Sequence, residues 1–314
     1  MIEYRDVRKS YGDKEIIRGI SFTVEAGEFI VIIGPSGCGK TTTVKMLNRL
    51  IDATSGSILI DGVDTREMDL LRLRTSVGYV IQQIGLFPNM TVEENISVVP
   101  KIMKWSKDKT LARVKELMEM VHMPYDDYAK KYPKQLSGGQ QQRVGVLRAM
   151  ATNPPIIIMD EPFGALDPIT REILQAEVKK IQKEFHITIL FITHDMHEAM
   201  KMADRVIFMD QGVIRQQATP RQMLLHPATE EITRFISLQE VGLDEGNLTA
   251  EDIMQRIPDG EVSGNVLTVG RQERLSEIGK HISLSANDPI YVKDDSGKPV
   301  GMITIGSILK HLSK

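Results

Sequence analysis

Short runs of apolar residues recur along the chain, and each gives way abruptly to glycine or to polar residues. Four such runs are Phe29–Ile33, Val77–Ile81, Ile156–Met159 and Thr188–Ile192. Unbroken apolarity over four or five residues is typical of strands that are buried on both faces. Helical spacing separates them, so the pattern predicts an α/β fold.

Other stretches add further predicted elements. Residues Ile2–Val7 and Ile16–Val24 are predicted to be short strands with Tyr11 in the loop between them, and Gly56–Gly62 a hairpin strand. Thr91–His122 has helical spacing, which Pro100 is expected to end or kink. The remaining predicted elements are helices over Val144–Ala151, about Thr170–Phe185 and His197–Ala203, and a hairpin of Val206–Met209 with Val213–Arg215.

A glycine-rich loop follows the first buried run. Its sequence is Gly34-Pro35-Ser36-Gly37-Cys38-Gly39-Lys40-Thr41, and a helix begins at Lys40. Strand, loop and helix together are the context of a P-loop, in which backbone N–H groups and the helix N-terminus surround phosphate oxygens. Lys40 is expected to reach the β- and γ-phosphates, and Thr41 to offer its hydroxyl to Mg²⁺. The alternative is an ordinary glycine-rich turn.

A second candidate anion site lies at Ser137-Gly138-Gly139-Gln140. Ser137 is a good helix N-cap, and the two glycines expose backbone amides at the start of the next helix. The alternative is a simple entry from loop to helix.

Polar residues end three of the buried runs. Gln82 follows one, Asp160 and Glu161 follow another, and His194 follows the last. Ligands bind at the carboxyl ends of strands in α/β sheets. Asp160 is therefore expected to hold Mg²⁺, and Glu161 to act as general base on the attacking water. His194 is a candidate γ-phosphate contact. Gln82 could equally be a polar strand cap, and a lone histidine is more often structural.

Composition narrows the class of protein. The chain has 314 residues, of which 41% are hydrophobic and 26% charged, as in a globular protein with one large or two modest domains. A net charge of -3 gives no support for nucleic-acid binding. A single cysteine excludes a disulfide within the chain. Neither a membrane-spanning run nor a signal-peptide pattern is present, so we expect a cytosolic chain that can still dock on a membrane protein.

Six motifs in order resemble those of the ATP-binding subunits of ABC transporters. They are the P-loop (Gly34–Thr42), a Q-loop (Gln82), a signature (Leu136–Gln140), Walker B (Ile156–Asp160), a D-loop (Ala165–Asp167) and an H-loop (His194). The resemblance covers roughly Met1–Ile236. It implies a P-loop NTPase core with an antiparallel β-subdomain and a helical subdomain at about residues 86–150.

The resemblance also assigns roles. Tyr11 would stack on adenine, and two copies would pair head to tail, so that Ser137, Gly138, Gly139 and Gln140 of one copy cap the ATP on the other. The ATP-binding set would further include Gly34, Pro35, Ser36, Gly37, Cys38, Gly39, Lys40, Thr41 and Thr42. The metal set would be Thr41, Gln82 and Asp160, and the catalytic set Glu161, His194, Lys40 and Gln82.

The tail differs from the rest of the chain. Residues 237–248 are predicted to be a linker and 249–314 a small α/β unit. Its strands are expected at Val266–Val269, Pro289–Val292 and Pro299–Thr304, and its helices at Thr249–Met254, Arg274–Ile282 and Ile305–Leu312. Asp295–Thr304 resembles part of a CBS repeat. Such repeats normally work in pairs, so either two chains supply one each and bind a regulatory nucleotide, or the tail only packs.

An ABC ATPase with CBS-like sequence is similar to the energising subunits of quaternary-amine importers, which carry glycine betaine, carnitine or choline. That resemblance implies transmembrane permease subunits, an extracytoplasmic substrate-binding protein or domain, and a peripheral location on the cytoplasmic face of the membrane. Ergothioneine import and bile-stress export remain open. A soluble ABC ATPase that is not coupled to transport is the other alternative.

Overall fold

The computed structural model comprises two compact units, Met1–Pro220 and Arg221–Lys314. It describes residues 1–81, 85–164, 166–240, 249–255, 257, 267–273, 278, 290–294 and 296–303, with backbone only for 237–240. Because the linker predicted at 237–248 lies largely outside this range, the predicted boundaries at 236 and 249 stay predictions. Each unit is described by itself.

A six-stranded sheet forms the centre of the first unit, in the order β10-β9-β3-β8-β7-β6. All neighbours are parallel except β10, which pairs antiparallel with β9. The strands are β3 (Phe29–Ile33), β6 (Val77–Val80), β7 (Ile156–Asp160), β8 (Thr188–Ile192), β9 (Arg205–Asp210) and β10 (Val213–Ala218). The apolar runs of the sequence are thus confirmed as strands, and every residue of β3, β7 and β8 is buried.

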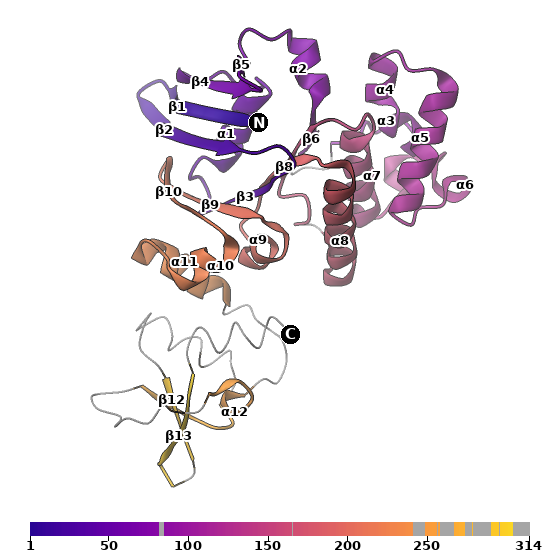
Figure 1. Cartoon of the computed structure of the whole chain (residues 1–314). Coiled ribbons are helices and arrows are strands. Elements are labelled where there is room, and N and C mark those ends of the chain that lie inside the picture. Colours follow the sequence, from indigo (N-terminus) through magenta and orange to yellow (C-terminus); the bar gives the residue numbers. More distant parts are fainter. Residues whose placement is uncertain are drawn as a thin grey trace. The chain divides into compact units, whose positions relative to one another are not determined.

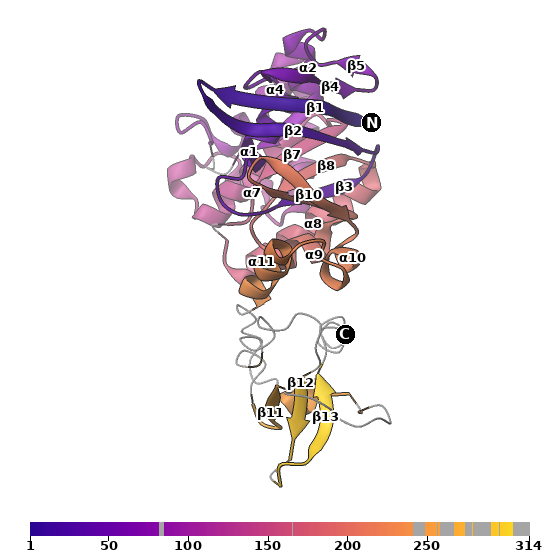
Figure 2. The same ribbon diagram turned by 90° about the vertical axis from the view of Figure 1, so that its left-hand side faces the viewer.

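A second, antiparallel sheet has the order β2-β1-β4-β5 (Figures 1 and 2). Its strands are β1 (Ile2–Tyr11), β2 (Lys14–Val24), β4 (Ser55–Ile60) and β5 (Val63–Asp64). The first two are longer than predicted. The expectation that Tyr11 lies in a loop is wrong, because it ends β1 and pairs with Lys14 across the turn at Gly12 and Asp13.

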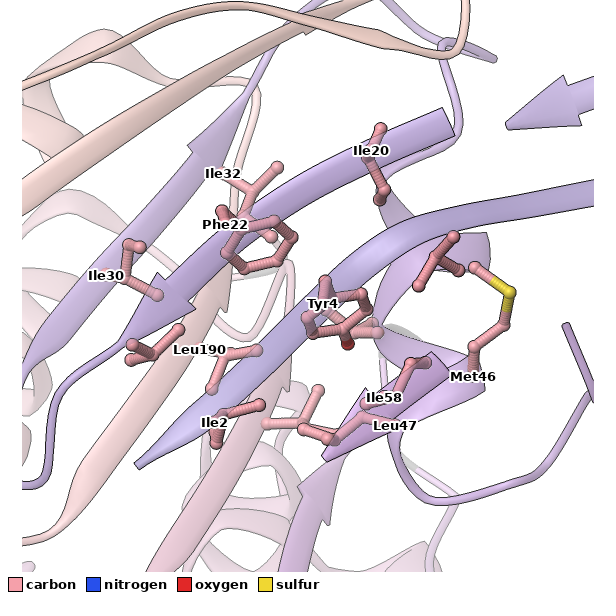
Figure 3. Close-up of a cluster of buried hydrophobic side chains, with 14 of the residues drawn as sticks. Ile2, Tyr4, Ile20, Phe22, Ile30, Ile32, Met46, Leu47, Ile58 and Leu190 are labelled. Atoms are coloured by element: carbon pink, nitrogen blue, oxygen red, sulfur yellow. The ribbon is translucent and has the colours of Figure 1, made fainter. Parts of the chain in front are cut away.

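The core of this unit joins the two sheets around α1 (Lys40–Leu47) (Figure 3). Tyr4 of β1 stacks on Phe22 of β2, with ring centroids 4.3 Å apart. The Tyr4 hydroxyl donates a 3.1 Å hydrogen bond to the carbonyl of Thr43 in α1. The helix that follows the glycine-rich loop is therefore held by a buried contact from the antiparallel sheet.

In the first unit, the predicted helical stretch Thr91–His122 is divided into three helices, whereas the helices predicted at Val144–Ala151 and about Thr170–Phe185 begin earlier in the structure. The helices of this unit are α1, α2 (Leu70–Ser76), α3 (Val92–Ile96), α4 (Val98–Ile102), α5 (Lys107–Met120), α6 (Tyr125–Tyr128), α7 (Gly138–Met150), α8 (Pro168–Phe185) and α9 (Met196–Met202), with a 3-10 turn at Pro133–Gln135. Elements α3 to α7 form a helical group beside the parallel sheet (Figure 1). None of the helices within the described ranges has the length and apolar character needed to cross a membrane.

The break expected at Pro100 falls earlier. A reciprocal capping box between Thr91 and Glu94 starts α3, as the sequence predicts. Ser97 then separates α3 from α4, and its hydroxyl donates to the carbonyl of Glu93 at 2.6 Å. Pro100 consequently lies near the start of α4, where its missing N–H is tolerated.

The second unit contains a three-stranded sheet in the order β11-β12-β13. Its elements are α10 (Pro220–Leu225, which begins at the boundary), α11 (Glu230–Glu240), α12 (Ala250–Ile253), β11 (Thr268–Gly270), β12 (Ile290–Lys293) and β13 (Pro299–Ile303). The predicted pairing of the last two strands is confirmed, and Asp294 caps their turn by accepting from the Ser296 and Lys298 N–H groups. The predicted helices Arg274–Ile282 (apart from Ile278) and Ile305–Leu312 lie outside the described residues, and the CBS likeness stays a prediction.

Candidate functional site

The glycine-rich loop leaves β3 through a position that only glycine can occupy. Gly34 has φ +143°, and a Cβ atom there would lie 1.9 Å from the carbonyl oxygen of Met209 on β9. Gly39 has φ +110°, and its added Cβ would meet Ile17 Cδ1 at 2.4 Å. Both glycines allow the backbone to curl closely against neighbouring strands. The loop then leads into the N-terminus of α1, which begins at Lys40 as the sequence predicts.

Lys40 lies at the inner edge of this loop. Its ammonium group donates to the carbonyls of Gly34, at 2.7 Å, and Pro35, at 3.0 Å, and the residue is only 7% exposed. Pro35, Ser36 and Gly37 are exposed. Burial raises the pKa of the neighbouring Cys38 thiol, which keeps it neutral. The loop therefore combines a buried cation with an accessible backbone, which suits it to phosphate.

Thr41 and Asp160 meet at the carboxyl ends of β3 and β7. The Thr41 hydroxyl donates to Asp160 Oδ1 at 3.1 Å. Asp160 is 3% exposed, and burial raises the pKa of its carboxyl group. The pKa of Tyr79 on adjacent β6 is raised too, first by burial and then by the charge of Asp160. A buried, under-compensated carboxylate beside a hydroxyl fits Mg²⁺, which takes few protein oxygens and completes its shell with phosphates and water.

The third pair of residues is Glu161 and His194. His194 Nδ1 lies 3.4 Å from Glu161 Oε1. Glu161 adopts a left-handed conformation, φ +48°, and its N–H donates to the carbonyl of Ile192 at 2.9 Å. This tie joins the ends of β7 and β8, so the two side chains meet. The His194 side chain is 62% exposed and accessible to a ligand.

Sequence reasoning missed a buried polar network behind His194. The Thr193 hydroxyl donates to Glu198 Oε2 at 2.6 Å, and the Gln175 amide donates to Glu198 Oε1 at 3.2 Å. Glu198 is 6% exposed, and burial raises the pKa of its carboxyl group. The signal in the sequence was Glu198, a glutamate among the buried positions of the short helix that follows His194. Only the packing of α8 against α9 shows its partners.

The signature residues begin α7 in the helical group. The Ser137 hydroxyl accepts from the Gln140 N–H at 3.3 Å, and the Gln140 side chain accepts from the Ser137 N–H at 3.0 Å. This capping box confirms Ser137 as the N-cap. Gly138 is exposed, and a Cβ added there would meet nothing within 4 Å. The start of α7 thus presents open backbone to its surroundings.

Three further residues were expected at the site: Tyr11, Thr42 and Gln82. The structure places the first two outside the pairs above, and Gln82 lies outside the described residues. Tyr11 is 53% exposed at the end of β1, and the Lys9 ammonium lies 4.7 Å from its ring centroid. Thr42 is half-buried in the first turn of α1. Gln82 follows β6 but lies outside the described residues, so its catalytic and metal-binding roles stay predictions. Among the described residues, no group of three or more His, Cys, Asp or Glu forms a metal cluster.

The class of protein is that of the P-loop ATPases, since a phosphate loop on β3 faces a buried carboxylate on β7 and a histidine after β8. The family model for the ABC transporter matches residues 17–164. The glycine betaine/carnitine/choline transport ATP-binding protein OpuCA of Bacillus subtilis is 45% identical over 316 residues, which is 100% of this chain and 81% of the relative. The chain belongs to the ABC transporter family as an ATP-binding subunit.

Two further comparisons agree. The osmoprotectant import ATP-binding protein OsmV of Salmonella typhimurium is 42% identical over 96% of this chain and 79% of the relative. Among solved structures, the dimeric post-hydrolysis state of the ATP-binding cassette MJ0796 bound to ADP and Pi is 34% identical, with a TM-score of 0.64. That match covers 70% of this chain and 99% of the cassette. The predicted fold, an ABC ATPase core with an antiparallel subdomain and a small C-terminal sheet, is confirmed.

Proposed function

We propose that this chain hydrolyses ATP to energise the import of a quaternary-amine osmoprotectant, such as glycine betaine, carnitine or choline, through a membrane permease. The observation that supports the substrate class is the likeness to the Bacillus subtilis protein over the whole chain, including the second unit. The shorter match to the choline transport ATP-binding protein OpuBA of Bacillus subtilis, 52% identical over 77% of this chain and 63% of the relative, points to the same chemistry.

The ATP phosphates bind in the loop from Gly34 to Thr42. The backbone amides and the N-terminus of α1 offer hydrogen-bond donors and partial positive charge. Lys40 exchanges its two loop carbonyls for the β- and γ-phosphates, which are stronger acceptors for an ammonium group. Tyr11 stacks on adenine with the ring face that Lys9 does not cover. These contacts place the γ-phosphate at the carboxyl ends of the central strands.

Hydrolysis needs a water molecule that is positioned and deprotonated at the γ-phosphate. Glu161 is the general base, and His194 contacts the γ-phosphate and orients Glu161 across their 3.4 Å pair. Thr41, Asp160 and Gln82 would hold Mg²⁺, which supplies charge neutralisation on the phosphate oxygens. The carboxylate of Asp160 is suited to this because burial has already removed most of its water.

A single copy supplies only half of the phosphate contacts. Gly138 and Gly139 offer backbone donors at the start of α7, and we propose that they cap the ATP held by a second copy together with the side chains of Ser137 and Gln140. Two solved relatives are described as dimeric cassettes, which supports this pairing. ATP then lies in the interface between the copies, and hydrolysis places repelling phosphates there and reopens it.

The remaining partners follow from the proposed transport role. The pair of ATPase copies would bind transmembrane permease subunits on the cytoplasmic face of the membrane, and an extracytoplasmic binding protein or domain would deliver the amine. Selection among amines would belong to these partners, since the nucleotide site described above contacts only ATP.

The proposal is tested by co-purifying the chain with its permease and measuring ATPase activity in nanodiscs with a series of amines. We expect glycine betaine, carnitine or choline, presented by the binding protein, to stimulate turnover, and Glu161→Gln to abolish the stimulation. Stimulation by ergothioneine or a bile acid alone would replace the substrate class. Failure to co-purify with any permease would favour an ATPase that is not coupled to transport.

A second role is favoured by a cavity of about 470 Å³ in the second unit. It lies at the carboxyl ends of the parallel strands β11 and β12, and its charged lining residues are Arg271 and Lys293 together with Glu273 and Asp294. We propose that a regulatory nucleotide binds there through its phosphates, as the CBS likeness implies. Calorimetry of adenine nucleotides against the full chain and its Lys293→Ala variant tests this. Equal heats from the two proteins would leave the unit a packing module.

A further inference from the structure

We propose that Arg171 is a positioning residue that links the turn before α8 to the segment that holds His194. Through this link, closure of the paired copies around ATP would set the position of His194. The inference rests on the proposed function, because it concerns how the two halves of that composite site act together.

Arg171 contacts both segments at once. One guanidinium nitrogen donates to the carbonyl of Leu166 at 3.3 Å, and another lies 3.6 Å from Asp195 Oδ2. The side chain is 31% exposed and that of Asp195 is 28% exposed, so the ion pair is partly shielded from water. A planar guanidinium can make these two contacts in fixed geometry, whereas an ammonium group acts as a point charge.

Leu166 connects Arg171 to the signature. Its side chain is 5% exposed, and a Cβ atom added at Gly139 would come within 3.1 Å of Leu166 Cδ2. Directly after it, Asp167 caps α8 by accepting from the Thr170 N–H at 3.0 Å. The turn is therefore packed against the start of α7, which is the surface proposed to cap the ATP of a second copy.

Asp195 connects Arg171 to His194. Its carboxylate caps α9 by accepting from the His197 N–H at 2.7 Å, and its own N–H donates to the Thr193 hydroxyl at 2.9 Å. Thr193 is fixed in turn by its bond to buried Glu198. Thr193 and Asp195, the residues on either side of His194, are thus fixed by hydrogen bonds. The ion pair between Asp195 and Arg171 connects this segment to α8. A shift of the turn at Leu166 would move His194 relative to Glu161.

The test removes the charge from either side of the ion pair. Arg171→Gln keeps a donor for the Leu166 carbonyl, and Asp195→Asn keeps a capping oxygen for α9. Lys179→Gln is the matched control, since Lys179 also lies on α8 and bridges a carbonyl and a carboxylate, Met202 at 2.7 Å and Asp204 at 3.0 Å. Steady-state ATPase of the full chain gives kcat and KM, and thermal melting reports stability.

We expect Arg171→Gln and Asp195→Asn each to lower kcat roughly tenfold with KM for ATP unchanged, since small displacements far from the chemistry can cost as much as about 100-fold. The double variant should be no slower than either single variant. Lys179→Gln should lose comparable melting temperature and keep its kcat. Additive losses, or a kcat of the Arg171 and Asp195 variants equal to that of the control, would overturn the proposal.

The experiment still tests the link if one variant fails to fold, and it distinguishes failure of the link from failure of the proposed function. If Arg171→Gln fails to fold, Asp195→Asn removes the same ion pair, and a kcat at the control level would by itself overturn the link. Failure of the proposed function has a different signature, in which the unaltered chain hydrolyses no ATP or Glu161→Gln turns over normally. If only the proposed link is wrong, the unaltered chain still hydrolyses ATP and Glu161→Gln still blocks that hydrolysis.

Discussion

The hydroxyl of Thr41 donates to Asp160 at 3.1 Å although the two residues are 119 positions apart in the chain. Strand order explains the meeting: β8 lies between β3 and β7, so all three strands end at the same edge of the sheet. A hydroxyl and a carboxylate from two motifs are therefore arranged before any ligand arrives, which lowers the cost of ordering them around a metal–nucleotide complex.

Asp160→Asn tests the proposed metal role. Loss of the carboxylate should lower ATP hydrolysis by about 100-fold or more, because charge neutralisation by a metal ion is worth several kcal/mol. ATP binding measured without Mg²⁺ should be retained, because the loop contacts are intact. Equal Mg²⁺ dependence of ATPase in the variant and the unaltered chain would contradict the assignment.

The same variant has a signature in the pH dependence of stability. Burial raises the pKa of Asp160 above its usual 3.8, so the folded state holds this proton more tightly than the unfolded state. The resulting stability is present below pH 3.8 and is lost as the pH rises through the raised pKa. Relative to the unaltered chain, Asp160→Asn should therefore gain unfolding free energy as the pH rises above 3.8. Denaturant melts at a series of pH values measure the unfolding free energies of both proteins. A difference between them that stays constant with pH would refute the buried charge.

Gly34→Ala should disrupt the loop itself. The new methyl group would lie 1.9 Å from the Met209 carbonyl at φ +143°, and such strain costs about 3 kcal/mol or more of unfolding free energy. Gly37→Ala is the control, since its Cβ would meet nothing within 4 Å, and φ +78° alone costs about 1–2 kcal/mol. Chemical denaturation measures both, and equal losses would show that the close approach at Gly34 is unimportant.

Tyr11→Ala tests adenine stacking. Stacking of a base on an aromatic ring is worth about 1–3 kcal/mol, so ATP should bind roughly 5- to 150-fold more weakly. Tyr11→Phe keeps the ring and should bind as before. Titration with a fluorescent ATP analogue gives both affinities. Wild-type affinity in the alanine variant would leave Tyr11 as an exposed strand-end tyrosine.

His194→Ala separates binding from hydrolysis. The histidine contributes no core packing, being largely exposed, so ATP affinity should be unchanged while kcat falls about 100-fold or more. Equilibrium binding and single-turnover hydrolysis on the same preparation distinguish the two effects. Lost ATP binding would mean that His194 has a structural role.

Local sequence predicted those features that depend on local order. The apolar runs at Phe29–Ile33 and Thr188–Ile192 became buried strands with the predicted bounds, and the Ser137 cap appeared as expected. Each reflects a pattern complete within a few residues, such as a run of buried side chains or a serine three positions before a glutamine. The order of the family's motifs supplied the class of fold, an ABC ATPase core with an antiparallel subdomain.

What sequence could not supply depends on contacts between distant segments. The Glu198 network and the Arg171 link each join α8 to the end of β8 or the start of α9, and neither partner is marked by spacing. The break before α4 was misplaced at Pro100 because proline is compatible with a first helical turn, and the serine hydroxyl that ends α3 competes locally with the helix. Tyr11 was placed in a loop, whereas in the structure β1 continues to Tyr11 and only Gly12 and Asp13 form the turn.

The central claim is that ATP binds between two copies and that Glu161 drives its hydrolysis. Light scattering of Glu161→Gln with Mg-ATP, together with phosphate release, tests both parts in one sample. The account predicts a stable dimer that forms with ATP, is absent with ADP, and releases almost no phosphate. A variant that remains monomeric with ATP, or one that releases phosphate at the rate of the unaltered chain, would contradict it.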